Sequence, residues 1–433
     1  MVNRVYTLND PLENRDGKLF IDGADASVLA AKFDTPLYVI SERRIRENYQ
    51  RLNQALTRNY RKTKINYAAK ANSNLAVLKI LETEGANVDA VSPGEVLMAL
   101  TSGFTPDRIL FTGTSVRTDE LRFLADSNVT INVDSLSELD RLLKIAVPKI
   151  LSVRVNPEVG AGHHEHVITA GKESKFGLWK QDTVKAYAAA KKAGVEKFGI
   201  HMHIGSGILD PVPFVAALEN LLITAKSVHE QVGVGFEFVD MGGGLGVPYK
   251  PEEKLLDLVA FSEKALSLFK TKANEYHLGE PFFCVEPGRF LIADACVLLT
   301  SVNTVKTTPF KKFIGVDAGF NTLVRPAMYG SYHQILVANK LDYDDEEKVD
   351  VAGPICESGD LLAKDRTLPR IEEGDLLSVL NAGAYGFSMS SQYNARPRAA
   401  EVLVKDGSYK LVREREQLDD LMSSQRQTTE WQR

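Results

Sequence analysis

Between residues 65 and 286 the sequence alternates short apolar runs with longer amphipathic runs, and this alternation constrains the fold more than any other feature. Strands that are joined by helices pair in parallel, because each crossover helix brings the chain back to the end of the sheet at which the previous strand began. Eight such strands predict a parallel (β/α)8 barrel of the TIM type. An open doubly wound sheet is the alternative that this number of strands leaves open. The predicted strands are residues 65–69, 87–91, 109–112, 130–133, 150–155, 198–203, 236–240 and 282–286.

The pattern changes after about residue 292, where strand-like runs separated by turn residues continue to residue 413 with few helical patterns. This texture is typical of an antiparallel β domain, either a barrel or a sandwich. We expect the domains to be residues 37–292 for the (β/α)8 barrel and 293–420 for the β domain. We expect residues 1–36 to pack with the β domain and residues 421–433 to form a polar tail.

Composition excludes several classes of protein. The chain of 433 residues carries 52 basic and 57 acidic side chains, which gives no reason to expect nucleic acid or a membrane surface as a partner. No apolar run approaches the roughly 20 residues of a membrane span. The three cysteines have no framework spacing, and the polar N-terminus has no signal-peptide core, so we expect a cytoplasmic protein.

Lys70 follows the first predicted barrel strand directly. Lysine is costly to bury unless its charge is paired or removed, and desolvation frees the nucleophilic amine that Schiff-base enzymes use. The alternative is a solvated loop lysine, as charged residues usually are.

Polar groups end seven of the eight predicted strands, and the carboxyl ends of the strands are where (β/α)8 barrels carry their chemistry. We therefore expect the functional groups to gather at one end of the barrel. They are Lys70; Asp89 and Ser92; Asp134; Arg154 and Asn156; His201, His203 and Ser206; Asp240 with Gly242–Gly244; and Glu286 with Arg289.

Two turns at this end are suited to an anion. The glycines from Gly242 to Gly246 let a phosphate approach several backbone N–H groups closely. The turn Pro287-Gly288-Arg289 adds an arginine that can bind an anion through two hydrogen bonds. We expect one phosphate between them, although either turn alone could be merely flexible.

His201 and His203 are two residues apart on a predicted strand, so both side chains can point into the barrel. This spacing also suits a metal pair, and a metal-dependent barrel hydrolase is the main rival interpretation. Further ligands would have to come from His163, His164 and His166, in a glycine-containing loop that we interpret as solvated or facing the substrate. The other possible role for His203 is to lie flat on an aromatic ring.

Seven motifs occur in an order that resembles the fold-type III pyridoxal-phosphate-dependent decarboxylases, and among them the diaminopimelate decarboxylase family. The resemblance covers about residues 15 to 420. It implies decarboxylation of meso-2,6-diaminopimelate to L-lysine and CO2, the last step of lysine biosynthesis. The motifs are residues 67–72, 203–206, 242–246, 286–289, 325–329, 356–360 and 382–386.

The resemblance also implies where pyridoxal 5'-phosphate would bind. Lys70 would hold the cofactor as a Schiff base, His203 would stack on its ring, and Glu286 would pair with the pyridine nitrogen. A protonated pyridine nitrogen makes the cofactor a deeper electron sink. The remaining cofactor-binding residues would be Asp89, Ser206, Gly243, Gly244, Pro287, Gly288, Arg289 and Tyr385.

By the same resemblance, Arg289, Arg325 and Tyr329 would hold the carboxylate end of the substrate, and Tyr385 would reach both cofactor and substrate. Two arginines argue for a second carboxylate, and leaving buried groups unpaired is a strong way to reject a substrate that lacks it. The alternative for Arg325 is that it only positions a subunit interface.

Cys356 would be the proton donor and Glu357 would bind the distal ammonium group. In the family the matching residues come from the neighbouring subunit, so the resemblance implies a homodimer with shared active sites. A buried, inert Cys356 is the alternative, but the polar residues that follow it fit packing less well. Besides the hydrolase, a basic amino-acid decarboxylase, an amino-acid racemase and a non-catalytic pyridoxal carrier remain as alternatives.

Overall fold

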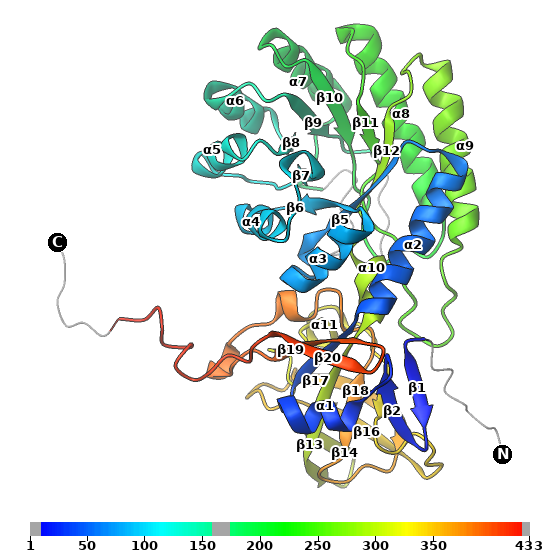
Figure 1. The fold of residues 1–433 in the computed structure, drawn as a ribbon, viewed down its shortest axis with the longest axis vertical. Coiled ribbons are helices and arrows are strands. Elements are labelled where there is room, and N and C mark those ends of the chain that lie inside the picture. Colours follow the sequence, from blue (N-terminus) through cyan, green and yellow to red (C-terminus); the bar gives the residue numbers. More distant parts are fainter. Residues whose placement is uncertain (1–9, 158–173, 427–433) are drawn as a thin grey trace. The chain divides into compact units, whose positions relative to one another are not determined.

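The computed structural model of the chain describes residues 10–157 and 174–426. Its contacts divide the chain into two compact units (Figure 1). One runs from Arg44 to Asp294, and the other combines the segment that ends at Arg43 with the segment that begins at Ala295. Each unit is described by itself.

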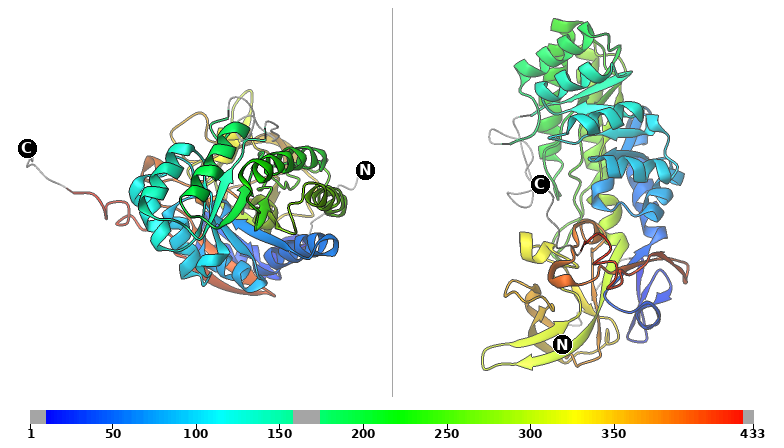
Figure 2. Two further views of the ribbon diagram at one scale, coloured as in Figure 1. Left: turned by 90° about the horizontal axis from the view of Figure 1, so that it is seen from above. Right: turned by 90° about the vertical axis from the view of Figure 1, so that its left-hand side faces the viewer.

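The Arg44–Asp294 unit contains a closed barrel of eight parallel strands, which confirms the (β/α)8 prediction. The barrel closes where β12 pairs with β5, with Val285 beside Ile65. Viewed from above in Figure 2, helices surround these strands. The strands are β5 (Thr63–Ala68), β6 (Asn87–Ala90), β7 (Ile109–Phe111), β8 (Thr130–Val133), β9 (Ile150–Arg154), β10 (Lys197–His201), β11 (Phe238–Asp240) and β12 (Phe282–Val285).

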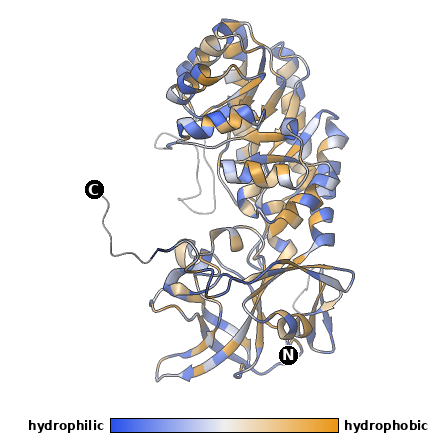
Figure 3. Ribbon diagram, turned by 60° about the vertical axis from the view of Figure 1, so that its left-hand side comes forward, coloured by the Kyte–Doolittle hydropathy of each residue, from blue (hydrophilic) through white to orange (hydrophobic). Residues whose placement is uncertain are grey.

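Local sequence signals set where the barrel helices begin. Ser92 and Ser135 are N-caps, and their hydroxyls accept from the backbone N–H groups of Glu95 and Glu138. Hydrophobic residues run along the strands, while the helices mix hydrophobic and hydrophilic residues (Figure 3). Among the described helices, none combines the length and apolar character that a membrane span requires. The helices are α2 (Glu42–Asn59), α3 (Leu75–Glu84), α4 (Pro93–Thr101), α5 (Thr118–Asp126), α6 (Leu136–Ile145), α7 (Lys180–Lys192), α8 (Val212–Val232), α9 (Leu258–Glu275) and the short α10 (Arg289–Ile292).

The other unit is built on a sheet in the order β17-β16-β14-β13-β4-β19-β20, with β18 and β15 joined to it through β13. Most pairings are antiparallel, as predicted, but β14 with β16 and β4 with β19 are parallel. Its strands are β4 (Leu37–Ser41), β13 (Cys296–Thr307), β14 (Lys312–Val316), β15 (Ile335–Val337), β16 (Glu346–Ala352), β17 (Leu361–Pro369), β18 (Leu376–Val379), β19 (Ala400–Lys405) and β20 (Ser408–Arg413).

The N-terminal segment belongs to this β unit. A small sheet of β1 (Leu12–Arg15), β2 (Lys18–Ile21) and β3 (Ala24–Asp25) leads into α1 (Ala26–Phe33). Asp25 caps α1 by accepting from the N–H groups of Ser27 and Val28. Leu19, Ile21 and Leu29 pack into one core with residues of β4, β13 and β19.

The predicted start of the barrel at residue 37 differs from the structure, in which the division falls at Arg43. Strand β4 lies between β13 and β19, with Val39 beside Val297 on one side and Val402 on the other. All five of its residues are buried, so it reads as a continuous apolar run. That pattern is also typical of a parallel barrel strand, and the sequence alone therefore does not tell which sheet β4 joins.

Replacing Leu37 by alanine tests this placement, because Leu37 has no exposed surface in the core of the β unit. We expect Leu37→Ala to lower the free energy of unfolding by about 2–5 kcal/mol, measured by urea denaturation. Leu411→Ala is the control on β20, where the residue is 43% exposed, and it should change stability by no more than about 0.5 kcal/mol. Equally small losses in both variants would contradict the placement of β4.

Candidate active site

Lys70 lies in the turn Ala69–Ala71 that follows β5, at the carboxyl end of the barrel strands. Its Nζ is 2.6 Å from Oδ2 of Asp89, which is fully buried at the end of β6. The other oxygen of Asp89 accepts from the hydroxyl of Thr112. A buried carboxylate therefore holds the amine in place and can receive the proton that the amine loses when it acts as a nucleophile.

Glu286 follows β12 and is 3% exposed. Its Oε2 is 3.1 Å from Nε2 of His201, whereas Oε1 has no hydrogen-bond partner among the described residues. Burial raises the pKa of Glu286 well above its ordinary value, and the charge of Asp89 adds to this, while Lys70 and Arg154 oppose it. A buried carboxylate oxygen without a donor is costly, so this atom is suited to a donor that arrives with a ligand.

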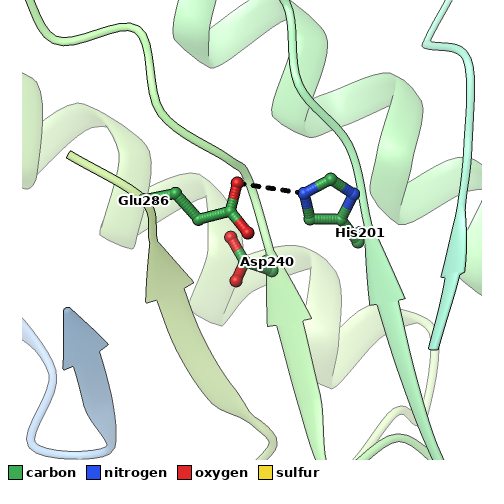
Figure 4. Close-up of side chains that lie close together, drawn as sticks. All are labelled: His201, Asp240 and Glu286. Atoms are coloured by element: carbon green, nitrogen blue, oxygen red, sulfur yellow. Dashed lines mark hydrogen bonds and ion pairs between the residues drawn. The ribbon is translucent and has the colours of Figure 1, made fainter. Parts of the chain in front are cut away.

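Asp240 ends β11 and has no exposed surface. Its Oδ2 accepts from Nδ2 of Asn66 at 2.8 Å, and its Oδ1 accepts from the N–H of Gly242 at 2.8 Å. Burial, followed by the nearby charge of Glu286, raises its pKa well above the ordinary value. Figure 4 shows His201, Asp240 and Glu286 converging from three neighbouring strands.

These three side chains bear on the hydrolase interpretation, because their ligand atoms all lie within 4.8 Å of one another and could hold a metal ion. All three residues are buried. His201 and Glu286 also engage each other, and Asp240 is engaged by Asn66 and Gly242. The pair of His201 and His203 proposed from the sequence is not the set that the structure brings together, and His163, His164 and His166 lie outside the described residues.

The glycine turn after β11 packs directly against neighbouring backbone. A Cβ on Gly242 would lie 2.3 Å from the carbonyl oxygen of Met202, and one on Gly243 would lie 2.3 Å from that of Glu286. Gly242 also has a positive φ of 75°. Only glycine fits this approach, which leaves the turn without side chains beside Glu286.

His203 is oriented by this glycine turn, since the N–H of Gly243 donates to its Nδ1 at 3.0 Å. Its proton in the neutral form is therefore on Nε2. Desolvation lowers the pKa of His203 well below its ordinary value, and the charges of Arg154 and Lys70 lower it further. A neutral imidazole in a fixed orientation fits the ring-stacking role predicted from the sequence.

Arg289 begins α10 and is 3% exposed. Its Nε and Nη2 donate to the hydroxyl of Ser206 at 3.3 and 3.1 Å, and its Nη1 donates to the hydroxyl of Tyr249 at 2.8 Å. The structure thus brings together Ser206 and Arg289, two of the residues that the resemblance assigns to the cofactor. Tyr249 was not predicted, because a tyrosine in a loop carries no distinctive pattern.

The two turns are also tied to the rest of the barrel end by backbone hydrogen bonds. The carbonyl oxygen of Pro287 accepts from Ala68 at 3.3 Å, which places the turn through Gly288 beside the strand that ends before Lys70. The carbonyl oxygen of Gly244 accepts from Ile208 at 2.9 Å. The predicted cofactor-binding residues of this unit therefore share one end of the barrel.

In the β unit, two predicted substrate residues lie close to a third, Arg325, which begins the short helix α11 (Arg325–Tyr329) and is 2% exposed. Its guanidinium lies 5.5 Å from the ring of Tyr329 and 5.8 Å from that of Tyr385. Its Nη2 donates to the hydroxyl of Ser331 at 3.2 Å. Tyr385 has a φ of 58°, a strained backbone conformation of the kind found at functional sites.

Cys356 and Glu357 lie on an exposed loop of the same unit. The buried Asp360 anchors this loop, because its Oδ2 accepts from the N–H of Ile355 at 2.7 Å. Its Oδ1 accepts from the N–H of Phe320 at 2.6 Å and so ties a second loop to the first.

Two residues that the sequence interpretation missed also contact this loop. Asn394 accepts from the N–H of Cys356 at 2.8 Å, and the hydroxyl of Tyr393 donates to Oε2 of Glu357 at 3.2 Å. The hydrogen bond to Glu357 raises the pKa of Tyr393. Asn394 has a positive φ of 57°, which asparagine tolerates better than most residues, but this conformation is seen only in the structure.

A comparison with protein families matches a segment that nearly coincides with the barrel unit. Residues 42–293 match the pyridoxal-binding domain of the pyridoxal-dependent decarboxylases. The chain is 59% identical over 413 residues to a diaminopimelate decarboxylase of Methanothermobacter thermautotrophicus, covering 95% of this chain and 96% of the relative. It is 43% identical to that of Archaeoglobus fulgidus, covering 96% and 98%.

A solved structure gives the same result. The diaminopimelate decarboxylase of M. jannaschii in complex with L-lysine superposes with a TM-score of 0.90 at 36% identity, covering 97% of this chain and 98% of the other. Both the barrel and the β unit lie within the matched length. The chain belongs to the diaminopimelate decarboxylase family of pyridoxal-phosphate-dependent carboxy-lyases.

Proposed function

We propose that this chain decarboxylates meso-2,6-diaminopimelate to L-lysine and CO2, the last step of lysine biosynthesis, with Lys70 and Cys356 as its catalytic residues. The observation that carries the assignment of roles is that one end of the barrel holds both an amine and a deeply buried carboxylate with a free oxygen. Lys70, paired with Asp89, supplies the amine, and Glu286 supplies a carboxylate oxygen without a partner among the described residues.

The residues at this end fit pyridoxal phosphate. Lys70 would bond to its aldehyde, His203 would lie against its ring, and Oε1 of Glu286 would accept from its pyridine nitrogen. Ser206, the Gly242–Gly244 turn and Arg289 would hold its phosphate. When bound, the cofactor supplies the electron sink for the pair that remains on the substrate carbon after CO2 leaves.

The Arg325 cluster supports a substrate with a second carboxylate. A buried guanidinium with two tyrosine rings close by is suited to bind a carboxylate through two hydrogen bonds. Arg289 would share this carboxylate end, and Tyr385 would contact both cofactor and substrate. Glu357 would bind the distal ammonium group of the diamino diacid.

A homodimer with shared active sites is part of the proposal. Cys356 and Glu357 are exposed in the single chain, yet a proton donor acts best where water is excluded. Asp360 and Asn394 hold the backbone of their loop through the N–H groups of Ile355 and Cys356. We infer that the loop enters the site of a second copy, where the thiol of Cys356 delivers a proton to the substrate carbon.

We further propose that the enzyme works in the cytoplasm. All three cysteines are free, and two of them are buried. A thiol that must stay reduced to donate a proton suits a reducing compartment.

Lys70→Ala tests the site at its centre. The variant should lose the absorption of covalently bound pyridoxal phosphate and all measurable CO2 release, because no amine remains to bond to the aldehyde. Borohydride reduction of the wild-type protein should attach the cofactor permanently to Lys70, and peptide mapping should identify the labelled residue. Lys79→Ala, which replaces a lysine with a side chain 58% exposed, should match the wild type in both measurements. Retained absorption in Lys70→Ala would contradict the assignment.

Cys356→Ala should keep the cofactor spectrum but lower kcat by roughly 10²–10⁴-fold, the usual contribution of a positioned proton donor. Ser358→Ala is the control in the same loop and should leave kcat nearly unchanged. Normal turnover in Cys356→Ala would remove the thiol from the mechanism.

Arg325→Ala should reduce kcat/KM for diaminopimelate by roughly 10–100-fold, the effect of losing hydrogen bonds to a charged group. Residual activity on lysine, which lacks the second carboxylate, should fall far less. Arg325→Lys should restore little, because an ammonium cannot reproduce the two-pronged contact. Equal losses on the two substrates would show that Arg325 does not read the second carboxylate.

A further inference from the structure

The proposed function gives no role to the contact between His201 and Glu286, although both residues are buried at the end of the barrel. His201 ends β10 beside Asp240 on one side and Arg154 on the other. Glu286 lies two residues beyond Cys284, which pairs with Asp240 in the next strand along. The contact therefore passes over β11 and crosses the barrel interior (Figure 4).

The His201 ring is 1% exposed, and its direction is set by the strand that carries it. Nε2 lies 3.1 Å from Oε2 of Glu286, whereas Nδ1 has no hydrogen-bond partner among the described residues. A neutral imidazole carries one proton, and an ionised carboxylate only accepts hydrogen bonds. With Glu286 ionised, the proton of His201 must therefore be on Nε2.

The other charged groups around Glu286 do not replace this donor. Lys70 pairs with Asp89, and Asp240 accepts from its own two donors. Arg154 packs over the ring of Phe176 at 4.3 Å. Among the described residues, His201 is the only side chain whose hydrogen bond to Glu286 is recorded in the structure.

We propose that His201 is a positioning residue, whose Nε2–H holds Oε2 of Glu286 so that Oε1 is presented to the pyridine nitrogen of the cofactor. The inference rests on the proposed role of Glu286, and it explains why Oε1 of this residue has no partner among the described residues. Held at one oxygen, the carboxylate cannot rotate away. It can also stay ionised against the burial that raises its pKa, because a donor stabilises the charged form.

Three substitutions separate this role from simple packing. Glutamine places its side-chain N–H₂ close to the position of Nε2, asparagine reaches only as far as Nδ1, and leucine fills space without a donor. His201→Gln should therefore behave nearly as wild type. His201→Asn and His201→Leu should both bind pyridoxal phosphate about tenfold more weakly, the effect of one lost hydrogen bond to a charged group.

The readouts are the dissociation constant of pyridoxal phosphate, the absorption spectrum of the bound cofactor at fixed pH, and the split between kcat and KM. His201→Asn and His201→Leu should alter the spectrum and lower kcat at least about tenfold, while KM for diaminopimelate changes little. His229→Gln, on α8 and away from this contact, is the matched control and should change none of these.

Two outcomes would overturn the inference: wild-type spectra in His201→Asn and His201→Leu, or a His201→Gln variant as impaired as His201→Leu. Thermal unfolding of each variant identifies any loss that comes from the fold alone. Glu286→Gln separates this inference from the proposal on which it depends. An unchanged spectrum in Glu286→Gln would remove the role of Glu286 itself, whereas a changed spectrum there with a wild-type His201→Leu would remove only the role of His201.

Discussion

The structure of the barrel end depends on the cost of burying carboxylates. Asp89, Asp240 and Glu286 are each removed from water at the ends of strands, and every buried oxygen needs a donor to offset the lost hydration. Lys70 and Asn66 meet this need for two of them, and His201 meets it for one oxygen of the third. The residues to which we assign the chemistry are therefore held by the same contacts that make their burial tolerable.

The residues with proposed roles fall into two groups, one in each unit. The barrel unit gathers the groups suited to the cofactor, and the β unit gathers Arg325, Tyr329 and Tyr385 together with the loop of Cys356. Parallel strands place their carboxyl ends at one rim, which explains why the barrel collects reactive groups so densely. The β unit instead uses loops, and buried Asp360 fixes two of them through backbone N–H groups.

The sequence could predict the barrel because the alternation of apolar and amphipathic runs reflects which residues are buried. It could predict that polar side chains gather at one end of the barrel because polar residues follow the apolar runs. It misplaced Leu37–Ser41 because a strand buried on both faces looks the same in either sheet. The contact of His201 with Glu286 could not be predicted, since it depends on the register of β10 and β12 across the strand between them. The residues tied to the Cys356 loop, Tyr393 and Asn394, escaped notice because they act through local contacts that leave no pattern.

The exposure of the Cys356 loop has a consequence for how the enzyme behaves in solution. Under the proposed arrangement a lone chain holds its own cofactor but lacks its proton source, so specific activity should depend on total protein concentration. Diluting the enzyme below the dissociation constant of the dimer would then abolish its activity without unfolding the chain. Cells that make little of this protein would depend on the strength of subunit association to keep it working.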